Sequence, residues 1–200
     1  MQFFFKREWI SLQNKHFLLP AVLCAICAVL IQLIGSINYL SYQRNAIING
    51  AIWRMITGQL THVNWSHLLM NLSALALIVI INSNTKLTIN WWRITFICLW
   101  SVGLGLLIFN PEVLWYVGLS GLIHGWFTAG IIILFRTSPS KIIYILLLLL
   151  IKLVYEKLQN PANYIIGSDI IIISASHWYG ALSGIISGLL ENYLFNPKLK

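Results

Sequence analysis

Long apolar runs separated by short polar stretches set the pattern of this chain. Each run approaches the length of about 20 residues that an α-helix needs to cross the hydrocarbon core of a bilayer. The fifth run is the shortest and can be extended through Leu158. The pattern predicts an all-α membrane protein, a single bundle of six transmembrane helices within residues 1–200. The expected spans are residues 17–34, 65–81, 94–109, 113–135, 142–155 and 165–190.

The basic residues that flank these spans are distributed unevenly. One side has Lys6, Arg7, Lys15, Lys86, Arg93, Arg136, Lys141, Lys198 and Lys200, and the other has Arg44, Arg54, Lys152 and Lys157. The cytoplasmic side of a membrane protein carries the excess of Lys and Arg. We therefore expect both termini in the cytoplasm, with residues 1–16 as a cytoplasmic segment. Tryptophans at span edges fit interfacial anchors: Trp53, Trp65, Trp91, Trp92 and Trp115.

Composition narrows the class of protein further. Hydrophobic residues make up 58% of the chain and charged residues only 9%, whereas a soluble domain carries about a quarter charged residues. The formal charge of +8 is scattered between apolar runs, so it indicates membrane topology and no nucleic-acid partner. Cys24 and Cys27 lie inside the first span, where they are expected to be packing residues and not a redox pair.

Residues 36–64 form the longest connection, which we expect to be the first extracytoplasmic loop. A loop of this length is rarely plain linker. It contains Ile47, Ile48, Ile52, Trp53 and Met55, so part of it is expected to lie in the membrane interface.

A serine between glycines in the fourth span is the first candidate for chemistry. Ser120 lies in Gly118-Leu-Ser-Gly121, and a serine hydroxyl needs a neighbouring base to act as a nucleophile. His177 on the sixth span is the best candidate base, because Gly180, Gly184 and Gly188 follow it as a small-residue ridge that lets another helix approach closely. The alternative is that the glycines only pack and that His177 is a satisfied polar group.

A second pair of polar residues lies on the second span. His67 and Asn71 are four residues apart, so their side chains share one helix face. Donors aimed at one point are what a developing oxyanion requires. The alternative is an interhelical hydrogen-bonding role. Under the expected topology the second, fourth and sixth spans all begin on the non-cytoplasmic side of the membrane. Ser120 is then about two turns into its span, and His177 is two or three turns into its own.

No acid is expected within reach of His177. Asp169 is eight residues away, Glu191 is at the opposite membrane face, and Glu112 and Glu156 are near span edges. We therefore predict a Ser–His dyad. His124 is four residues after Ser120 on the same helical face, where it is expected to tune the dyad, contact substrate or bond to a neighbouring span.

The same residues are compatible with three other functions, each of them disfavoured. Metal or haem binding by His62, His67, His124 and His177 is disfavoured, because His62 and His67 are five apart and no carboxylate or thiolate accompanies them. We expect no metal and no cofactor. A transporter is disfavoured because no charged residue is expected at mid-span with a partner. A non-catalytic helix-binding protein would not need both Ser120 and His177.

At these residues the sequence resembles the rhomboid family of intramembrane serine proteases. The match covers Trp53-Arg54, the stretch from His62 to Asn71, Gly118-Leu-Ser-Gly121, and His177-Trp-Tyr-Gly180. The resemblance implies that Ser120 is the nucleophile and His177 the general base. It also implies an oxyanion hole formed by His67, Asn71 and the Ser120 backbone N–H.

The continuation Gly-Leu-Ile-His124-Gly125 departs from commoner rhomboids and is similar to the rhombosortase branch. That resemblance implies a bacterial inner-membrane protein whose active site opens to the periplasmic side. Its partners would be transmembrane protein substrates with a C-terminal Gly-Gly motif. Cleavage near the glycines would be followed by hydrolysis or by transfer to an amine-bearing membrane lipid. The alternative is a general rhomboid protease that hydrolyses other transmembrane substrates.

Overall fold

The structure is a computed structural model that describes residues 15–83, 89–134, 139–159, 164–166 and 170–195. Most of the expected segment 1–16 therefore lies outside the described residues. The longer helices are α1 (Lys15–Ile34), α5 (Trp65–Ser83), α6 (Trp91–Phe109), α7 (Ser120–Leu134), α8 (Pro139–Gln159) and α9 (Ser174–Leu190). The shorter elements are α2 (Ile37–Leu40), β1 (Tyr42–Gln43), α3 (Arg44–Ile48), α4 (Arg54–Leu60), β2 (Trp115–Tyr116), β3 (Tyr164–Ile166), β4 (Ile170–Ile172) and the π-helical segment η2 (Glu191–Phe195).

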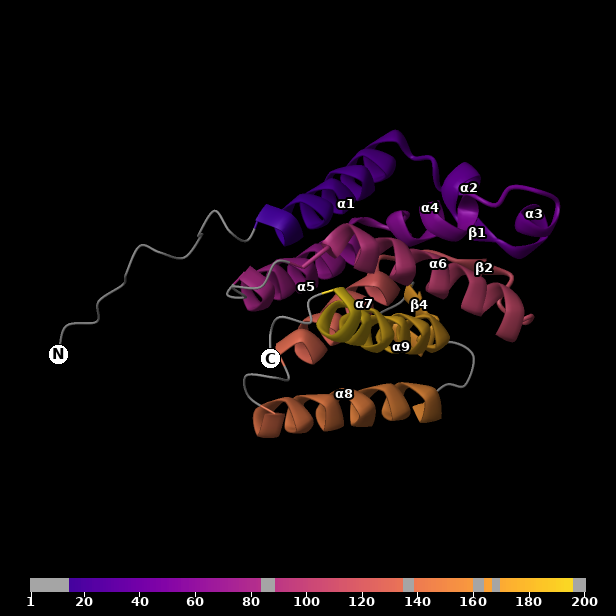
Figure 1. Cartoon of the computed structure of the whole chain (residues 1–200). Helices are drawn as coiled ribbons and strands as arrows, with labels where there is room; N and C mark the ends of the chain where they lie inside the picture. The colour runs from indigo at the N-terminus through magenta and orange to yellow at the C-terminus, as the bar shows by residue number, and fades with distance from the viewer. Residues whose placement is uncertain (1–14, 84–88, 135–138, 160–163, 167–169, 196–200) are drawn as a thin grey trace.

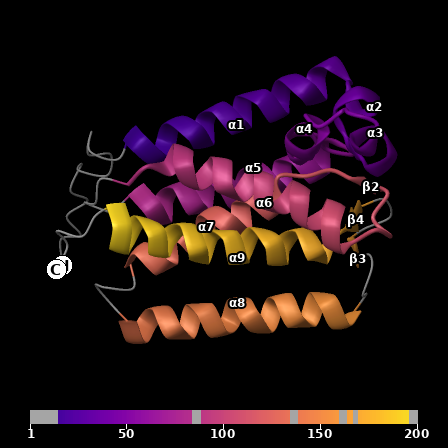
Figure 2. The same cartoon turned by 45° about the vertical axis from the view of Figure 1, so that its right-hand side comes forward.

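Helix α7 lies at the centre of the bundle. It contacts α5, α6, α8 and α9, and most of its side chains are buried. Helix α1 covers α5 and α6 on one side, and α8 runs along the other side next to α7 and α9 (Figures 1 and 2). Because lipid cannot satisfy backbone polar groups, a helix bundle suits this solvent.

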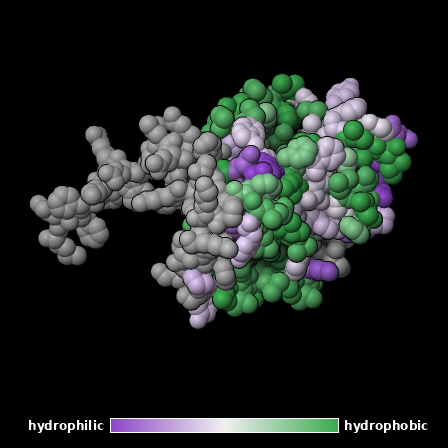
Figure 3. Space-filling view, in the orientation of Figure 1, coloured by the Kyte–Doolittle hydropathy of each residue, from purple (hydrophilic) through white to green (hydrophobic). Residues whose placement is uncertain are grey.

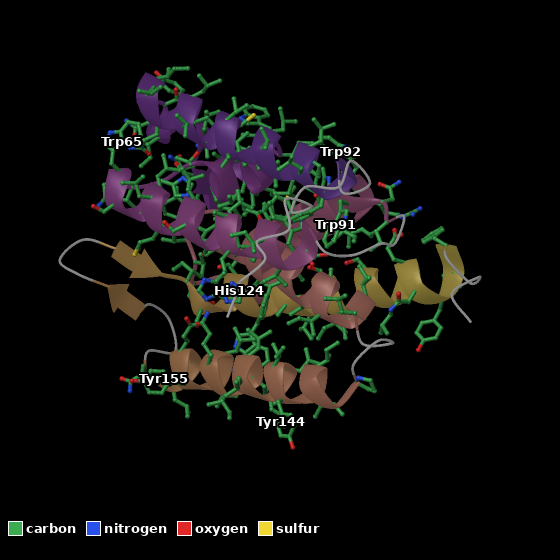
Figure 4. All side chains as sticks on the ribbon, turned by 90° about the vertical axis from the view of Figure 1, so that its left-hand side faces the viewer. Trp65, Trp91, Trp92, His124, Tyr144 and Tyr155 are labelled. Atoms are coloured by element: carbon green, nitrogen blue, oxygen red, sulfur yellow. The ribbon has the colours of Figure 1, made fainter. Side chains whose placement is uncertain are left out.

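Three described helices are long and apolar enough to span a membrane, namely α1, α5 and α6, and α7 is a shorter apolar helix. Their outward faces carry large hydrophobic side chains, and apolar residues cover broad areas of the face shown in Figure 3. Trp65 lies at one end of the bundle, with Trp91 and Trp92 at the other (Figure 4). Trp92 is exposed as an anchor should be, but Trp91 is buried against Phe17, with ring centroids 4.3 Å apart.

Two of the expected spans begin later than the hydropathy pattern predicts. The fourth begins at Ser120 and not at residue 113, because β2 precedes it and Gly118 adopts a φ of +123°. The sixth begins at Ser174 and not at residue 165, because β3 and β4 form an antiparallel pair before it. A run of isoleucine is equally apolar in a helix and in a strand, so hydropathy does not distinguish the two, and β-branched residues favour strands.

Residues 36–64 fold into a scaffold for the chain that precedes Ser120. Strand β1 pairs with β2 in antiparallel register, with Tyr42 opposite Tyr116. Arg54 is buried and donates through Nη1 to the Ser41 carbonyl at 2.9 Å. The Gln59 side chain donates to the Leu99 carbonyl of α6 at 2.7 Å. The loop is therefore an ordered part of the fold, tied to both α6 and β2.

Helices α7 and α9 pack backbone to backbone along the predicted glycine ridge. A Cβ added at Gly180 would meet the Gly121 carbonyl oxygen, and one at Gly184 would meet the Gly125 carbonyl oxygen. One turn further, Gly188 faces the Ala129 carbonyl oxygen. The pairing advances four residues on both helices together, so α7 and α9 run parallel and begin at the same end of the bundle.

We expect Gly180→Ala to weaken this packing, because the new methyl group would overlap a backbone carbonyl that cannot rotate away. Overpacking of this kind costs about 1–3 kcal/mol, and the thermal unfolding midpoint in detergent measures it. Gly188→Ala is the matched control, because its Cβ would lie 3.0 Å from the Ala129 oxygen and a small shift relieves that contact. Equal midpoints for the two variants would contradict the packing argument.

Candidate functional site

Ser120 and His177 meet at the adjacent ends of α7 and α9. Ser120 is the first residue of α7 and His177 the fourth of α9. The Ser120 Oγ lies 2.9 Å from His177 Nε2, which is hydrogen-bonding distance. The expectation that both lie two or more turns into their spans is wrong, because both helices begin later than predicted. Both residues nevertheless lie in the first turn of their helices, at the same end of the bundle.

Two hydrogen bonds to the backbone of Gly118 hold the segment before Ser120 in place. The Gly118 N–H donates to the Gly58 carbonyl at 3.1 Å, and the Tyr116 hydroxyl donates to the Gly118 carbonyl at 2.7 Å. Burial raises the pKa of Tyr116 to about 12, so its hydroxyl remains protonated and able to donate. These bonds fix the backbone two residues before Ser120.

Glycine is required at position 118 for two reasons. Its φ of +123° is a conformation that residues with a Cβ rarely adopt. A Cβ at this position would also lie 2.8 Å from His67 Cε1 and 3.0 Å from His67 Nε2. The missing side chain therefore leaves the space that the His67 ring fills.

His67 and Asn71 lie in the first two turns of α5, as the sequence predicts, and both are buried. The Asn71 amide nitrogen donates to the His67 carbonyl at 3.1 Å and lies 3.9 Å from the Cβ position of Gly118. The His67 Nδ1 is buried without a hydrogen-bond partner among the described residues. The structure thus brings both side chains next to the segment that leads into Ser120.

His124 lies directly against the Ser120–His177 pair. Its ring stacks on the ring of His177, with centroids 4.2 Å apart and planes 15° apart. Its Nδ1 donates to the Ser120 carbonyl oxygen at 2.7 Å, and its Nε2 lies 2.6 Å from Lys152 Nζ. The contact with Lys152 is the expected bond to a neighbouring helix, α8.

Glu156 is the site residue that sequence reasoning missed. Its Oε2 lies 2.9 Å from His177 Nδ1, and its Oε1 lies 2.8 Å from Lys152 Nζ. The expectation that no acid reaches His177 is therefore wrong, as is the expectation that no charged pair lies within a span. Both errors come from the expectation that Glu156 lies near a span edge without a partner, whereas α8 runs from Pro139 to Gln159 and carries Glu156 on its inner face.

A signal for Glu156 was present in the sequence. Ionisable residues within a membrane helix are rare and usually functional, and Lys152 and Glu156 are spaced as neighbours on one helix face. They lie on the same face of the helix as Leu153, which is buried. Charged residues at the buried positions of an otherwise lipid-exposed helix indicate partners in the bundle.

The remaining predicted glycines line the contact between α7 and α9. A Cβ at Gly121 would lie 3.1 Å from the Ser176 carbonyl oxygen, and Gly180 faces the backbone of Gly121 itself. These two glycines thus flank the Ser120–His177 pair. Their role is to set the distance between the two backbones.

His62 lies behind His67 and is buried, with the two ring centroids 5.0 Å apart in an edge-to-face arrangement. Burial lowers the pKa of His62 to about 3, so the ring stays neutral. In the part of the chain that the structure describes, no group of three His, Cys, Asp or Glu side chains is arranged to hold a metal ion.

An apolar pocket of about 180 Å³ lies beside the site. His124 is the polar residue in its wall, and Figure 4 shows this histidine inside the bundle on the side that faces α8. The pocket therefore lies between α5 and α8, with α7 behind it. The other lining residues are Ala74, Leu77, Ile78, Ile81, Ile123, Phe127 and Leu149.

Comparison with known proteins agrees with this geometry. A search of curated proteins finds no match to the chain. A comparison with models of protein families matches residues 49–197 to the Rhomboid domain. The matched segment covers most of the chain and includes Ser120, His177, His67 and Asn71. A chain of apolar helices with this domain is an integral membrane protein, and it belongs to the rhomboid family, whose members are generally intramembrane serine proteases.

Proposed function

We propose that this protein is an intramembrane serine endopeptidase that cleaves membrane-anchored proteins near a C-terminal Gly-Gly sorting signal. Ser120 is the nucleophile and His177 the general base. The observation that carries the proposal is the 2.9 Å contact between Ser120 Oγ and His177 Nε2 at adjacent ends of two closely packed helices. A serine hydroxyl becomes a useful nucleophile only when a base at this distance accepts its proton.

The chemical step follows from the position of each group. His177 Nε2 takes the proton of the Ser120 hydroxyl as Oγ attacks the carbonyl carbon of the scissile peptide bond. The developing oxyanion is held by His67, Asn71 and the Ser120 backbone N–H. That N–H belongs to the first residue of α7, so the helix itself offers it no acceptor. The protonated His177 then gives its proton to the leaving amine.

The substrate class fits the pocket and the chemistry of glycine. A substrate helix has to unwind before its carbonyl reaches Ser120, and each glycine weakens a helix by about 1 kcal/mol. The apolar pocket between α5 and α8 offers a lipid-side surface of matching character next to His124. The subfamily assignment is supported by His124, which contacts Ser120 and His177 and distinguishes this chain from commoner rhomboids.

The acyl-enzyme is resolved by water or by the amine of a membrane lipid. We propose one domain of six spans, with both termini in the cytoplasm of a bacterial cell. Residues 36–64 then lie outside, and the site opens to the periplasmic side of the inner membrane. The uneven distribution of Lys and Arg supports this orientation.

A fluorophosphonate probe tests the nucleophile directly. We expect the wild-type protein to be labelled, and Ser120→Ala and His177→Ala to lose labelling by at least about 10³-fold. Ser120→Ala should also keep the wild-type thermal unfolding midpoint, because it removes only one hydroxyl group from the first residue of α7. Ser73→Ala, at an exposed position on α5, is the control. Labelling that survives in Ser120→Ala would refute the assignment.

The oxyanion hole is tested by truncating its donors. Removal of one donor typically costs about 10²–10³ in the rate of the chemical step. We expect Asn71→Ala to lower the rate constant of probe inactivation by that amount with little change in probe affinity. Asn45→Ala, at an exposed position, serves as the control. If Asn71→Ala inactivates at the wild-type rate, Asn71 has a structural role only.

The substrate and the fate of the acyl-enzyme are read from one mass measurement. A co-expressed protein with a Gly-Gly-containing tail should acquire a new C-terminus near the glycines in the presence of wild-type enzyme but not of Ser120→Ala. A free carboxylate identifies hydrolysis, and an added amine-linked mass identifies transfer. An intact tail in cells whose enzyme labels with the probe would contradict the Gly-Gly assignment and favour a general rhomboid protease.

A further inference from the structure

The inner face of α8 carries two ionisable side chains in a helix otherwise built for lipid. Leu148, Ile151 and Tyr155 are exposed on the outer side, whereas Leu153 and Glu156 are buried. Lys152 is half-buried and pairs with Glu156 at 2.8 Å. Charges at such positions are expensive unless they have partners and a use. The partners here are the two histidines of the site.

The contacts of these side chains form a closed ring. It runs from Ser120 Oγ to His177 Nε2 at 2.9 Å, and from His177 Nδ1 to Glu156 Oε2 at 2.9 Å. It continues from Glu156 Oε1 to Lys152 Nζ at 2.8 Å, and from Lys152 Nζ to His124 Nε2 at 2.6 Å. It closes from His124 Nδ1 to the Ser120 carbonyl at 2.7 Å. Three helices contribute, so the ring fixes α8 against α7 and α9.

The donors and acceptors in this ring can be assigned from chemistry alone. A carbonyl only accepts, so His124 donates through Nδ1, and its Nε2 accepts from the Lys152 ammonium. That ammonium also donates to Glu156, whose second oxygen accepts from His177 Nδ1–H. His177 Nε2 is then unprotonated and accepts from the Ser120 hydroxyl. The 3.5 Å approach of Lys152 Nζ to His177 Nδ1 joins two donors and is no hydrogen bond.

We infer that Glu156 is a positioning residue that keeps His177 protonated on Nδ1 and free on Nε2, and that Lys152 holds the carboxylate in place. The inference rests on the proposed role of Ser120 and His177. Without the carboxylate, no acceptor in the ring holds a proton on His177 Nδ1, and the Lys152 ammonium 3.5 Å away favours the tautomer with Nε2–H, which cannot act as a base. In acyl-transfer sites an acid with this geometry both orients the ring and stabilises the imidazolium.

The proton movements are balanced within the ring. The Ser120 proton moves to His177 Nε2 as the C–O bond to the substrate forms, while the Nδ1 proton stays on the ring. The resulting imidazolium has a carboxylate at 2.9 Å. Lys152 neutralises that carboxylate before the reaction, so the ring carries no net charge in the resting state and gains one positive charge only when His177 does.

A structural role for the Lys152–Glu156 pair is the rival explanation, because the pair also ties α8 to the bundle. The double variant Lys152→Met/Glu156→Met distinguishes this structural role from the positioning of His177. Apolar replacement of a buried ion pair is often neutral or stabilising, so the double variant should keep the thermal midpoint of the wild type. It nevertheless lacks the carboxylate that orients His177.

The experiment measures the rate constant and the affinity of fluorophosphonate inactivation for the full-length protein in detergent. We expect Glu156→Gln and the double variant to lower the rate constant by about 10²–10⁴-fold at unchanged probe affinity. Glu156→Asp should retain more of the rate, because it keeps an ionised carboxylate. The controls are Glu112→Gln and Lys157→Met, which remove exposed charges of the same kinds and should leave the rate unchanged.

The tautomer of His177 provides a readout that does not depend on activity. In protein labelled with ¹⁵N-histidine and assigned with a His177 variant, the ring nitrogens should report protonated Nδ1 in the wild type. They should report a mixture of tautomers in Glu156→Gln and in the double variant. Wild-type inactivation rates or an unchanged tautomer in these variants would overturn the role of Glu156. A wild-type protein that is never labelled would instead count against the proposed protease, and the tautomer would still decide the role of Glu156.

Discussion

The close parallel packing of α7 against α9 is the constraint on which the rest of the site depends. A serine side chain has one rotatable bond before its oxygen, so Ser120 reaches an imidazole only if the two backbones nearly touch. Gly121 and Gly180 make that possible, because each lacks the methyl group that would keep the helices apart. In lipid no hydrophobic force drives helices together, so their association depends on small residues and the close packing that these allow.

The second constraint acts on the backbone before Ser120. A regular α-helix from residue 113 would require a φ of about −63° at Gly118. Instead Gly118 turns the chain with a positive φ, and the scaffold of residues 36–64 holds it through Gly58 and the β1–β2 pair. The first loop thus serves the site without contributing a reacting group. The length of this loop is explained by its role in holding the segment before Ser120.

The sequence predicted the parts of the site that rest on local spacing. Gly180, Gly184 and Gly188 identified the packing face of α9, and the four-residue spacing of His67 and Asn71 put both on one face of α5. Sequence reasoning failed where an element ends. Hydropathy does not distinguish an isoleucine-rich strand from a helix, so the predicted sixth span begins at residue 165, nine residues before the first residue of α9. It also placed Glu156 near the edge of the fifth span, and it could not show that α8 turns this side chain toward His177.

Helix α8 connects two properties of the site that are separate in the sequence. Leu149 lines the apolar pocket, and Lys152 and Glu156 follow it on the same face within two turns. In a membrane an unpaired carboxylate or ammonium is far more costly than a lost apolar contact, so the ring of polar contacts sets the position of α8 more firmly than its apolar side chains do. A displacement of α8 large enough to widen the pocket therefore also lengthens the contact between Glu156 and His177. The pocket wall at Leu149 and the carboxylate that contacts His177 therefore belong to one helix.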